Sequence, residues 1–280
     1  MIAVIRKPIP ITLQDNQSTW TESLCRARKA FFDAEAAWEA GGRVGAKPRK
    51  PIEADAKNAW YGQDGIRRVL EEEMFHHKCA YCEGSVRGHS HLHIEHFRPQ
   101  SVYPAFAYEW HNLLLACGIC NCKPYKEDRF PVGASAALAE PNRANPCEWN
   151  RAEMVVLVNP CVDDPAEFFV WKFEAISSGE EVTATLLSKR GNLRGSQTIT
   201  ICGLDRVNLT ENYRRQIGLV DTALSLHKMA VAFSQEENQI EALKSLKEFI
   251  SPRGTYSSMV RAYLEYRNFD LGQLTQSLQS

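Results

Sequence analysis

The chain has 280 residues, of which 44% are hydrophobic and 24% are charged, and its formal net charge is −1. This composition is typical of a folded protein and excludes a chain dominated by disorder. The near-zero charge excludes a uniformly basic protein that would attract nucleic acid through its overall field. No apolar run approaches the roughly 18 residues that a membrane span needs, and the apolar N-terminus is too short for a signal peptide. We therefore expect a cytoplasmic protein without membrane contact.

The first predicted element is an amphipathic helix over residues 19–40. Thr19 and Glu22 have the spacing of a capping box at its start, and Gly41 follows its last residue. A second helix is predicted over residues 64–77 from its helical apolar spacing. The residues on the buried face of this second helix would be Ile66, Val69, Leu70 and Met74.

Strands are predicted over residues 154–158, 168–173 and 182–187, where β-branched and aromatic residues stand between turn residues. From about residue 197 to 269 the pattern is helical again, in three or four helices. The fold class is therefore α+β, with helices around a small metal-stapled centre. We divide the chain into an N-terminal helical extension and linker (1–60), a cysteine- and histidine-rich core (61–131), a β-rich connecting region (132–190) and a C-terminal helical region (191–280).

Four of the nine cysteines form two Cys-x-x-Cys pairs, Cys79 with Cys82 and Cys117 with Cys120. An odd cysteine count without a signal peptide argues against a disulfide framework. Two such pairs can supply the four sulfurs of a tetrahedral, structural Zn2+ site. Coincidental spacing or redox chemistry are the alternatives, although the βαβ setting of redox pairs is missing. The remaining cysteines are expected outside this site, with Cys25, Cys147, Cys161 and Cys202 as small buried residues and Cys122 as a poor ligand.

The segment between the two pairs and the residue directly after the second pair include side chains suited to phosphodiester hydrolysis. That reaction needs an activated water and a cation that takes up charge on the phosphate and the leaving oxygen. His96 can act as the general base, since a neutral imidazole is abundant at pH 7. Glu95 and Asn121 offer oxygen ligands that suit Mg2+ or Mn2+. Neighbours on a regular strand face opposite sides, so Glu95 and His96 should lie where a strand ends.

These motifs resemble those of the HNH (ββα-metal) nuclease superfamily. Glu95-His96, Asn112 and a Cys-x-x-Cys pair followed directly by Asn121 carry this resemblance, which covers residues 79–131. A narrower likeness is to the HNH nuclease subunit (PtuB-like) of Septu and retron-associated anti-phage systems. The residues that carry it read Cys-Ala-Tyr-Cys-Glu, Ile-Glu-His-Phe-Arg-Pro, Asn-Leu-Leu-Leu-x-Cys and Cys-x-x-Cys-Asn. The short pieces Asn159-Pro160 and Gly203-Leu204-Asp205-Arg206 are similar to that family too, although they are less diagnostic.

The resemblance implies a metal-dependent endonuclease that hydrolyses DNA and leaves a 5′-phosphate and a 3′-hydroxyl. It implies that His96 is the base, that Glu95 and Asn121 hold the divalent cation, and that Asn112 positions the loop carrying His96. It also implies an ABC/SMC-like ATPase partner (PtuA-like). The alternative, from another functional class, is a catalytically inactive zinc-stapled module that binds nucleic acid or protein.

Basic and histidine residues around the core are weaker candidates. Arg98 and Lys123 could contact phosphates, as could Lys126 and Arg129. His89, His91 and His93 alternate with Glu95 on one strand face, where they could contact phosphate or a second metal, although an exposed polar surface is the favoured interpretation. The basic stretch 187–261 could bind nucleic acid or a partner through its arginines, although packing is the commoner use of such helices. Those arginines are Arg190, Arg194, Arg206, Arg214 and Arg215.

Overall fold

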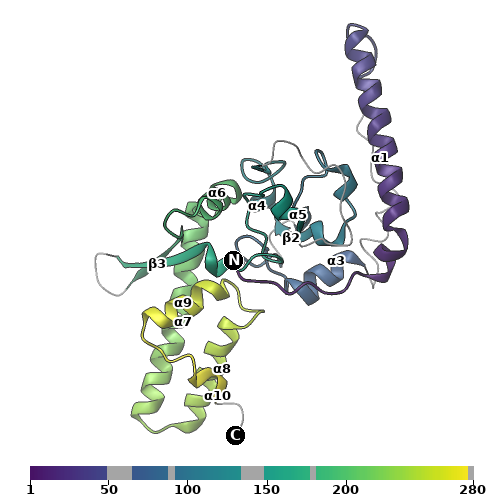
Figure 1. The fold of residues 1–280 in the computed structure, drawn as a ribbon. Coiled ribbons are helices and arrows are strands. Elements are labelled where there is room, and N and C mark those ends of the chain that lie inside the picture. Colours follow the sequence, from purple (N-terminus) through teal and green to yellow (C-terminus); the bar gives the residue numbers. More distant parts are fainter. Residues whose placement is uncertain (49–64, 88–91, 134–147, 177–180, 277–280) are drawn as a thin grey trace.

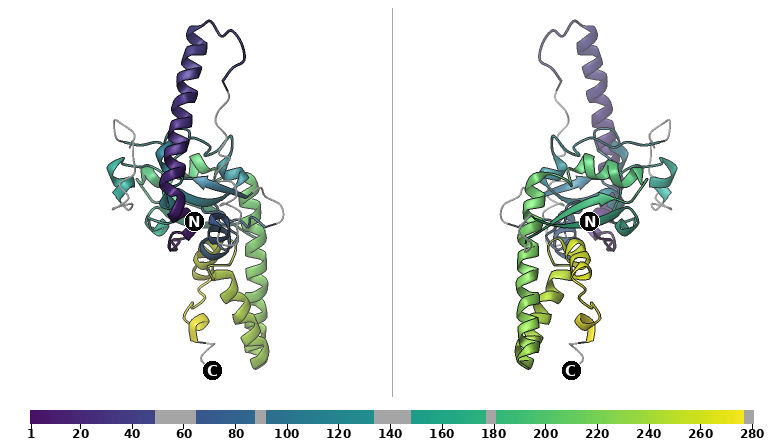
Figure 2. Two further views of the ribbon diagram at one scale, coloured as in Figure 1. Left: turned by 90° about the vertical axis from the view of Figure 1, so that its right-hand side faces the viewer. Right: turned by 90° about the vertical axis from the view of Figure 1, so that its left-hand side faces the viewer.

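The computed structural model describes residues 1–48, 65–87, 92–133, 148–176 and 181–276. These residues form a central body, with one long helix extending from it on one side and a group of C-terminal helices on the other (Figure 1). The two side views show the same arrangement (Figure 2). Helices and strands both occur, as expected for an α+β chain. None of the described helices combines the length and the apolar character needed to cross a membrane.

Helix α1 (Ile11–Ala40) is the long projecting helix, and it begins earlier than predicted. Thr19 lies inside it, so the prediction of a capping box at this position was wrong. The first turns are instead held by the central body, because the Gln17 side chain donates a hydrogen bond of 2.7 Å to Glu109 Oε2. The end of the helix at Gly41 agrees with the prediction.

The second predicted helix is shorter than expected and partly π-helical. It consists of α3 (Ile66–Arg68) and η1 (Val69–Met74). His76 and His77 follow with φ of 49° and 58°, a left-handed conformation that ends the helix. The predicted buried face is confirmed, since Ile66, Val69, Leu70 and Met74 are all buried.

The centre of the body is a hairpin followed at once by a short helix. Strand β1 (Leu92–His96) pairs antiparallel with β2 (Leu113–Cys117), and His96 lies opposite Leu113. Every residue of β2 is buried, which explains its unbroken apolar sequence. Helix α4 (Gly118–Asn121) begins directly after β2. The connection between the strands contains two 3-10 turns, η2 (Pro104–Phe106) and η3 (Trp110–Asn112).

A second hairpin, β3 (Phe169–Ala175) with β4 (Val182–Ser188), confirms two of the three downstream strands. The strand predicted over residues 154–158 was wrong. Met154 has a φ of 51°, and this segment makes only an isolated bridge, between Val132 and Val155. Its apolar residues serve packing instead, because Val155, Leu157 and Val158 are buried. The short elements before β3 are α5 (Trp149–Ala152) and η5 (Pro165–Glu167).

The C-terminal region is helical, as predicted. Gly203 ends α6 with a φ of 61°, and any Cβ added there would collide with the Tyr125 ring. Glycine at this position therefore brings the start of α7 close to the segment that follows α4. The helices of this region are α6 (Leu193–Cys202), α7 (Val207–Ala232), α8 (Glu236–Ile250), α9 (Ser257–Tyr266) and α10 (Gln273–Gln276).

One continuous apolar core runs through the body. It includes β2, the inner residues of β4 and the buried faces of α6, α7 and α9. Cys79, Cys82, Cys117 and Cys120 belong to this core. A smaller cluster around Phe106 and Trp149 packs beneath the loop that joins β1 to β2. The cysteine group is therefore integrated into the main core of the chain.

Candidate functional site

The four predicted zinc ligands converge on one point inside the core. Their Sγ atoms all lie within 4.8 Å of one another, and Cys79, Cys82, Cys117 and Cys120 are all buried. Four sulfurs bound to one tetrahedral zinc at about 2.3 Å would lie roughly 3.8 Å apart, close to the 4.0 Å between the Sγ atoms of Cys82 and Cys117. The group could therefore hold a metal such as zinc. No other set of three or more His, Cys, Asp or Glu side chains in the described part of the chain is arranged in this way.

The pKa values of the four thiols diverge, with those of Cys82 and Cys117 lowered and those of Cys79 and Cys120 raised. Hydrogen bonds from Cys120, Cys79 and Cys82 hold the pKa of the Cys117 thiol far below its usual value. Arg206, at the start of α7, lies with Nη1 3.4 Å from Cys120 Sγ. We had considered Arg206 for nucleic-acid or partner binding, and the structure places it on the cysteine group. Its charge offsets part of the negative charge of four thiolates around a divalent ion.

His96 is the last residue of β1, at the strand end where the sequence predicted it. Its Nε2 lies 2.9 Å from the backbone oxygen of Ala107. A carbonyl oxygen can only accept, so Nε2 carries the proton and the lone pair lies on Nδ1. Burial lowers the pKa of His96 to about 4, and the charge of Lys126 acts in the same direction. At neutral pH the ring is therefore uncharged, with its basic nitrogen in a fixed position.

Asn112 fixes the loop that holds His96. Its Oδ1 accepts a hydrogen bond of 2.7 Å from the backbone N–H of Arg98. Its Nδ2 donates to the backbone oxygens of Arg98, at 3.1 Å, and Phe106, at 3.0 Å. These contacts join the two sides of the loop next to Ala107, whose carbonyl orients His96. The fully buried Asn112 side chain thus has the position needed for a loop-positioning role.

Glu95 lies on the face of β1 opposite to that of His96, and it is only 3% exposed. The Tyr81 hydroxyl donates to its Oε1 at 3.0 Å, and Lys126 forms an ion pair with the same oxygen. Burial raises the pKa of Glu95, and Lys126 and Tyr81 oppose that rise. Lys126 also donates to the backbone oxygen of His96, at 3.1 Å. Sequence reasoning missed both partners of Glu95, because neither is near it in the chain.

Asn121, the last residue of α4, contacts His93 and not Glu95. Its Nδ2 lies 3.3 Å from His93 Nδ1, and Cys122 Sγ lies 3.8 Å from the same ring nitrogen. His93 was expected on an exposed polar face, but it is half-buried beneath α4. The two predicted cation ligands therefore have different partners in the structure, and His93 is an unexpected neighbour of one of them. The other two alternating histidines, His89 and His91, lie outside the described residues.

The structure contradicts the prediction that Arg98 contacts phosphates. Arg98 is 2% exposed, and its Nε donates to Glu153 Oε2 at 2.7 Å. Its guanidinium also lies over three aromatic rings, those of Phe106, Phe130 and Trp149. Lys126 is equally enclosed, so it is not a surface phosphate contact either. Lys123 remains a candidate, since its side chain is 82% exposed beside Glu127.

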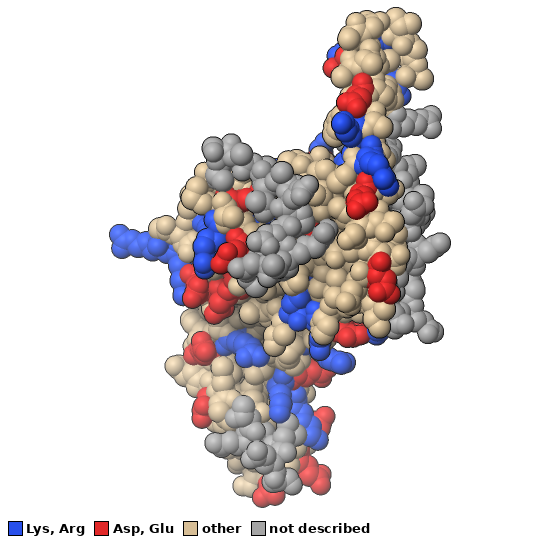
Figure 3. Space-filling view, turned by 45° about the vertical axis from the view of Figure 1, so that its right-hand side comes forward, with Lys and Arg blue, Asp and Glu red and all other residues tan. Residues whose placement is uncertain are grey.

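Several arginines of the basic C-terminal stretch are engaged in ion pairs. Arg194 pairs with Asp163 at 2.7 Å, and Arg214 and Arg215 both pair with Glu211. On the face seen in Figure 3, basic and acidic side chains are mixed and no wide area of one sign is visible. The described arginines thus give this face no broad positive surface for nucleic acid.

The other cysteines vary in burial. Cys202 is buried as predicted, whereas Cys25 and Cys161 are only half-buried and Cys122 is exposed. Cys147 lies outside the described residues. None of these four described cysteines belongs to the compact sulfur group.

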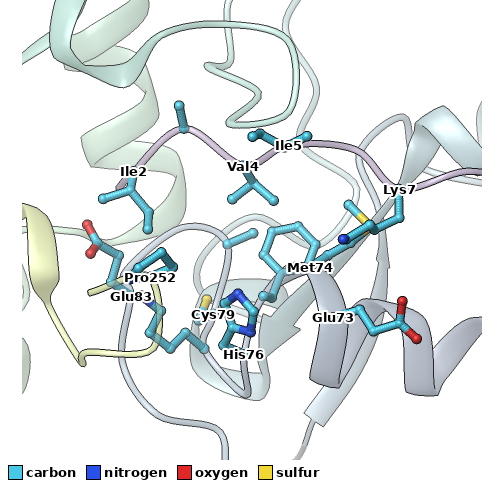
Figure 4. Close-up of a pocket in the computed structure, with 14 residues that line it drawn as sticks. Ile2, Val4, Ile5, Lys7, Glu73, Met74, His76, Cys79, Glu83 and Pro252 are labelled. Atoms are coloured by element: carbon cyan, nitrogen blue, oxygen red, sulfur yellow. The ribbon is translucent and has the colours of Figure 1, made fainter. Parts of the chain in front are cut away.

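A separate cavity of about 300 Å3 lies between the N-terminal segment and the turn after η1 (Figure 4). Ile2, Val4 and Ile5 line one side of it, and Met74 and His76 line the other. Its wall includes one of the sulfur ligands, Cys79, but none of the residues proposed for catalysis. Lys7, Glu73, Lys78 and Glu83 also line it, so its wall is mixed, and it is distinct from the candidate catalytic residues on β1 and α4.

Comparison with known proteins finds a similar protein that aligns with nearly the whole chain. A "Septu protein PtuB" from Bacillus mycoides (strain KBAB4) is 28% identical, with 93% of this chain and 88% of the relative aligned. The chain is similar to Septu protein PtuB along most of its length. A second Septu protein PtuB, from Bacillus thuringiensis, is 26% identical over 82% of each chain. No family model and no solved structure matches the PtuB-like chain. The matches confirm the Septu resemblance and extend it well beyond the core motifs.

Proposed function

We propose that this PtuB-like chain is a metal-dependent HNH-type endonuclease that hydrolyses DNA as the effector of an anti-phage defence system. One observation carries the proposal. The neutral His96 ring is oriented by the Ala107 carbonyl, within a loop that Asn112 holds in place. This histidine stands on a hairpin that continues directly into a four-cysteine group.

In this proposal His96 is the general base. Its Nδ1 would accept the proton of the attacking water while Nε2–H stays bound to Ala107. The lowered pKa makes the imidazole a weaker base, but it ensures that the ring is unprotonated at every physiological pH. Products would carry a 5′-phosphate and a 3′-hydroxyl.

Glu95 and Asn121 are the residues we propose to hold a divalent cation, Mg2+ or Mn2+. Both Glu95 contacts end on Oε1, and its Oε2 has no hydrogen-bond partner among the described residues. The Asn121 amide can turn its oxygen toward a cation, because amide oxygen and nitrogen have nearly the same size. Such a cation supplies charge neutralisation at the phosphate and the leaving oxygen.

The cysteine group has a structural role in this account. Four thiolates fill a tetrahedral zinc ion and leave no position for water or substrate. Cys117 ends β2 and Cys120 lies in α4, whereas Cys79 and Cys82 come from the loop after η1. Zinc would therefore lock three segments together and set the position of Asn121.

We also propose an ABC/SMC-like ATPase partner (PtuA-like) that supplies much of the affinity for DNA. The near-neutral chain and its ion-paired arginines support a dependence on a partner. Retention of DNA should be weak for the lone chain and stronger for the complex, with both decreasing as salt rises. Equal and strong retention by the lone chain would contradict this part of the proposal.

The nuclease is tested with supercoiled plasmid. The chain, with and without the ATPase, is incubated with Mg2+, Mn2+ or EDTA, and His96→Ala is compared with wild type. Cation-dependent nicking by wild type is the expected result. Nicking that persists in EDTA would show that cleavage does not depend on a divalent cation.

A second candidate, an inactive zinc-stapled binding module, is favoured by the ion pair between Lys126 and Glu95. A lysine held on a proposed cation ligand reduces its affinity for a cation. This candidate predicts that DNA is bound equally in Mg2+ and in EDTA and is never cut, even when the ATPase is present.

A further inference from the structure

Helix α7 has apolar side chains on two of its sides. The inner side is buried against β4, α8 and α9. In both views of Figure 2 the helix runs along the outer edge of the molecule, and its outer side carries large apolar residues that are 56–69% exposed. These exposed residues are Leu219, Leu226, Met229 and, directly after the end of the helix, Phe233.

The spacing of these residues is that of a coiled-coil seam. Together with Thr222 they occupy positions 219, 222, 226, 229 and 233, at alternating intervals of three and four residues that place them on one side of a helix. We call these five residues the α7 strip. A single exposed leucine needs no explanation, but a contiguous apolar strip marks a contact surface. Gly218, Ser225 and Ala232 border the strip and are exposed, and their small side chains allow a second helix to approach closely.

The two ends of the α7 strip carry opposite charges. Arg215 precedes Leu219 by one turn, and its side chain is 74% exposed beside Glu211. Glu236 and Glu237 follow Phe233 in the first turn of α8. Both are exposed and form no ion pair in the described part of the chain. An antiparallel helix with the same pattern would therefore meet an opposite charge at each end of the strip.

The chain itself has this pattern. Position 226 lies midway between 219 and 233 and also midway between 215 and 237. If two copies of α7 cross antiparallel at Leu226, Leu219 of one copy lies against Phe233 of the second copy, and Arg215 lies near Glu237 of the second copy. Every contact then occurs twice, as a two-fold interface requires.

We infer that the α7 strip is a dimerisation surface that binds the same strip of a second copy of this chain in antiparallel orientation. The inference does not depend on the proposed nuclease. The strip is about 21 Å long, and one such helix contact is smaller than a standard interface of about 800 Å2 per partner. The dimer is therefore reversible, and its population rises with the concentration of the chain.

The test is sedimentation velocity of the full-length, zinc-loaded chain over a wide range of concentration, without DNA or ATPase. Wild type should change from monomer to dimer as the concentration rises. Leu226→Glu should weaken the dimer by at least about 100-fold, because it places two like charges at the two-fold axis. Val231→Glu is the matched control, since Val231 is 52% exposed on another side of α7, and it should dimerise as wild type does. Circular dichroism and zinc content verify the fold of each variant.

A charge exchange tests the antiparallel orientation without changing an apolar residue. Arg215→Glu and Glu237→Arg should each weaken the dimer several-fold, because each places like charges at both ends of the strip. The double variant should recover dimerisation, since it restores opposite charges. A parallel pair would hold these two positions at opposite ends and would show no such recovery.

A wild-type chain that stays monomeric at every concentration would overturn the inference, as would a dimer that Leu226→Glu leaves unchanged. A double variant that does not recover would overturn the antiparallel orientation. If wild type is monomeric and Leu226→Glu instead weakens binding to the ATPase, the strip is a contact for that partner and the inference is wrong.

Discussion

The cysteine group and the candidate catalytic residues lie on the same hairpin and helix, yet they are organised differently. The four sulfurs form a compact set that needs only an ion, with every Sγ within 4.8 Å of the others. His96, Glu95 and Asn121 instead contact three different groups, the Ala107 carbonyl, Lys126 and His93. One region is assembled around a common centre, and the other is held in place residue by residue.

Because of this difference, the residues on which the stability of the fold depends can be distinct from the residues proposed for catalysis. Removing a sulfur ligand affects a site on which three segments of the core depend. Removing one of the candidate catalytic side chains should break a local contact and leave the sulfur group untouched. Variants of the two regions should therefore differ in which property they lose.

The largest effect is expected for Cys117→Ser. Zinc binding by four thiolates contributes apparent free energies of about 10–16 kcal/mol in small zinc domains, much of it as folding free energy. The variant should lose zinc and the cooperative unfolding transition, as measured by metal analysis and circular dichroism. Cys122→Ser is the matched control, because Cys122 is exposed and outside the group. A Cys117→Ser chain that keeps its zinc and its stability would refute the proposed structural role of the four-cysteine zinc site.

His96→Ala should abolish most cleavage and leave the fold intact. General bases typically contribute about 10²–10⁴-fold to rate, and the histidine is only half-buried at a strand end. Cleavage rate, zinc content and midpoint of unfolding are measured on the same preparation. Loss of zinc along with activity would show that the two regions are not separable in this way.

The pH dependence follows from the lowered pKa of His96. The ring should stay neutral down to about pH 4 in the folded chain, whereas its ordinary value is 6.5. The cleavage rate should therefore stay nearly constant between pH 8 and pH 5 and decrease only near pH 4. The unfolded chain takes up this proton first, so the stability gained from a neutral His96 is complete above pH 6.5 and is lost as the pH falls toward 4. A decline in kcat/KM centred near pH 6.5 would contradict the lowered pKa of His96.

Lys126→Met should destabilise the chain by about 3–5 kcal/mol, since it leaves the buried Glu95 carboxylate without its charge partner. Adding Glu95→Gln to this variant should recover much of the loss, because no buried charge then remains. Denaturant unfolding of the two single variants and the double variant measures the coupling. Additive effects would show that the ion pair is not formed in solution.

Lys123→Ala should have the smallest effect on stability, within about 1 kcal/mol, because its ion pair with Glu127 is exposed. If Lys123 contacts phosphate, the variant should weaken DNA retention uniformly across sequences and reduce its salt dependence. Unchanged retention would remove Lys123 from the predicted phosphate contacts near the core.

The parts of the fold with strong local signals could be predicted from the sequence. The Cys-x-x-Cys spacing predicts that the two thiols of each pair lie close together. The end of α1 at Gly41 and the buried face of residues 66–74 follow from helical periodicity. The start of α1 could not be predicted, because a contact with Glu109 holds its first turns. The apolar run at 154–158 was mistaken for a strand because burial alone does not distinguish strand from packed loop.

The same limit applies to the candidate site. Sequence placed His96 at a strand end and Asn112 near its loop, and the structure has both there. It could not show that Lys126, 31 positions after Glu95, forms a buried pair with that carboxylate. Arg98 was expected to contact phosphate, yet Glu153 and three aromatic rings enclose it. Such pairs depend on tertiary contacts that no local pattern records.

The most direct test of the account is imidazole rescue of plasmid nicking by His96→Ala, in the presence of the ATPase and a divalent cation. If His96 acts only as the base, added imidazole should restore part of the lost cleavage in the zinc-loaded variant and have no effect on wild type. Wild-type rates in the variant without imidazole would contradict the central claim that this ring activates the attacking water.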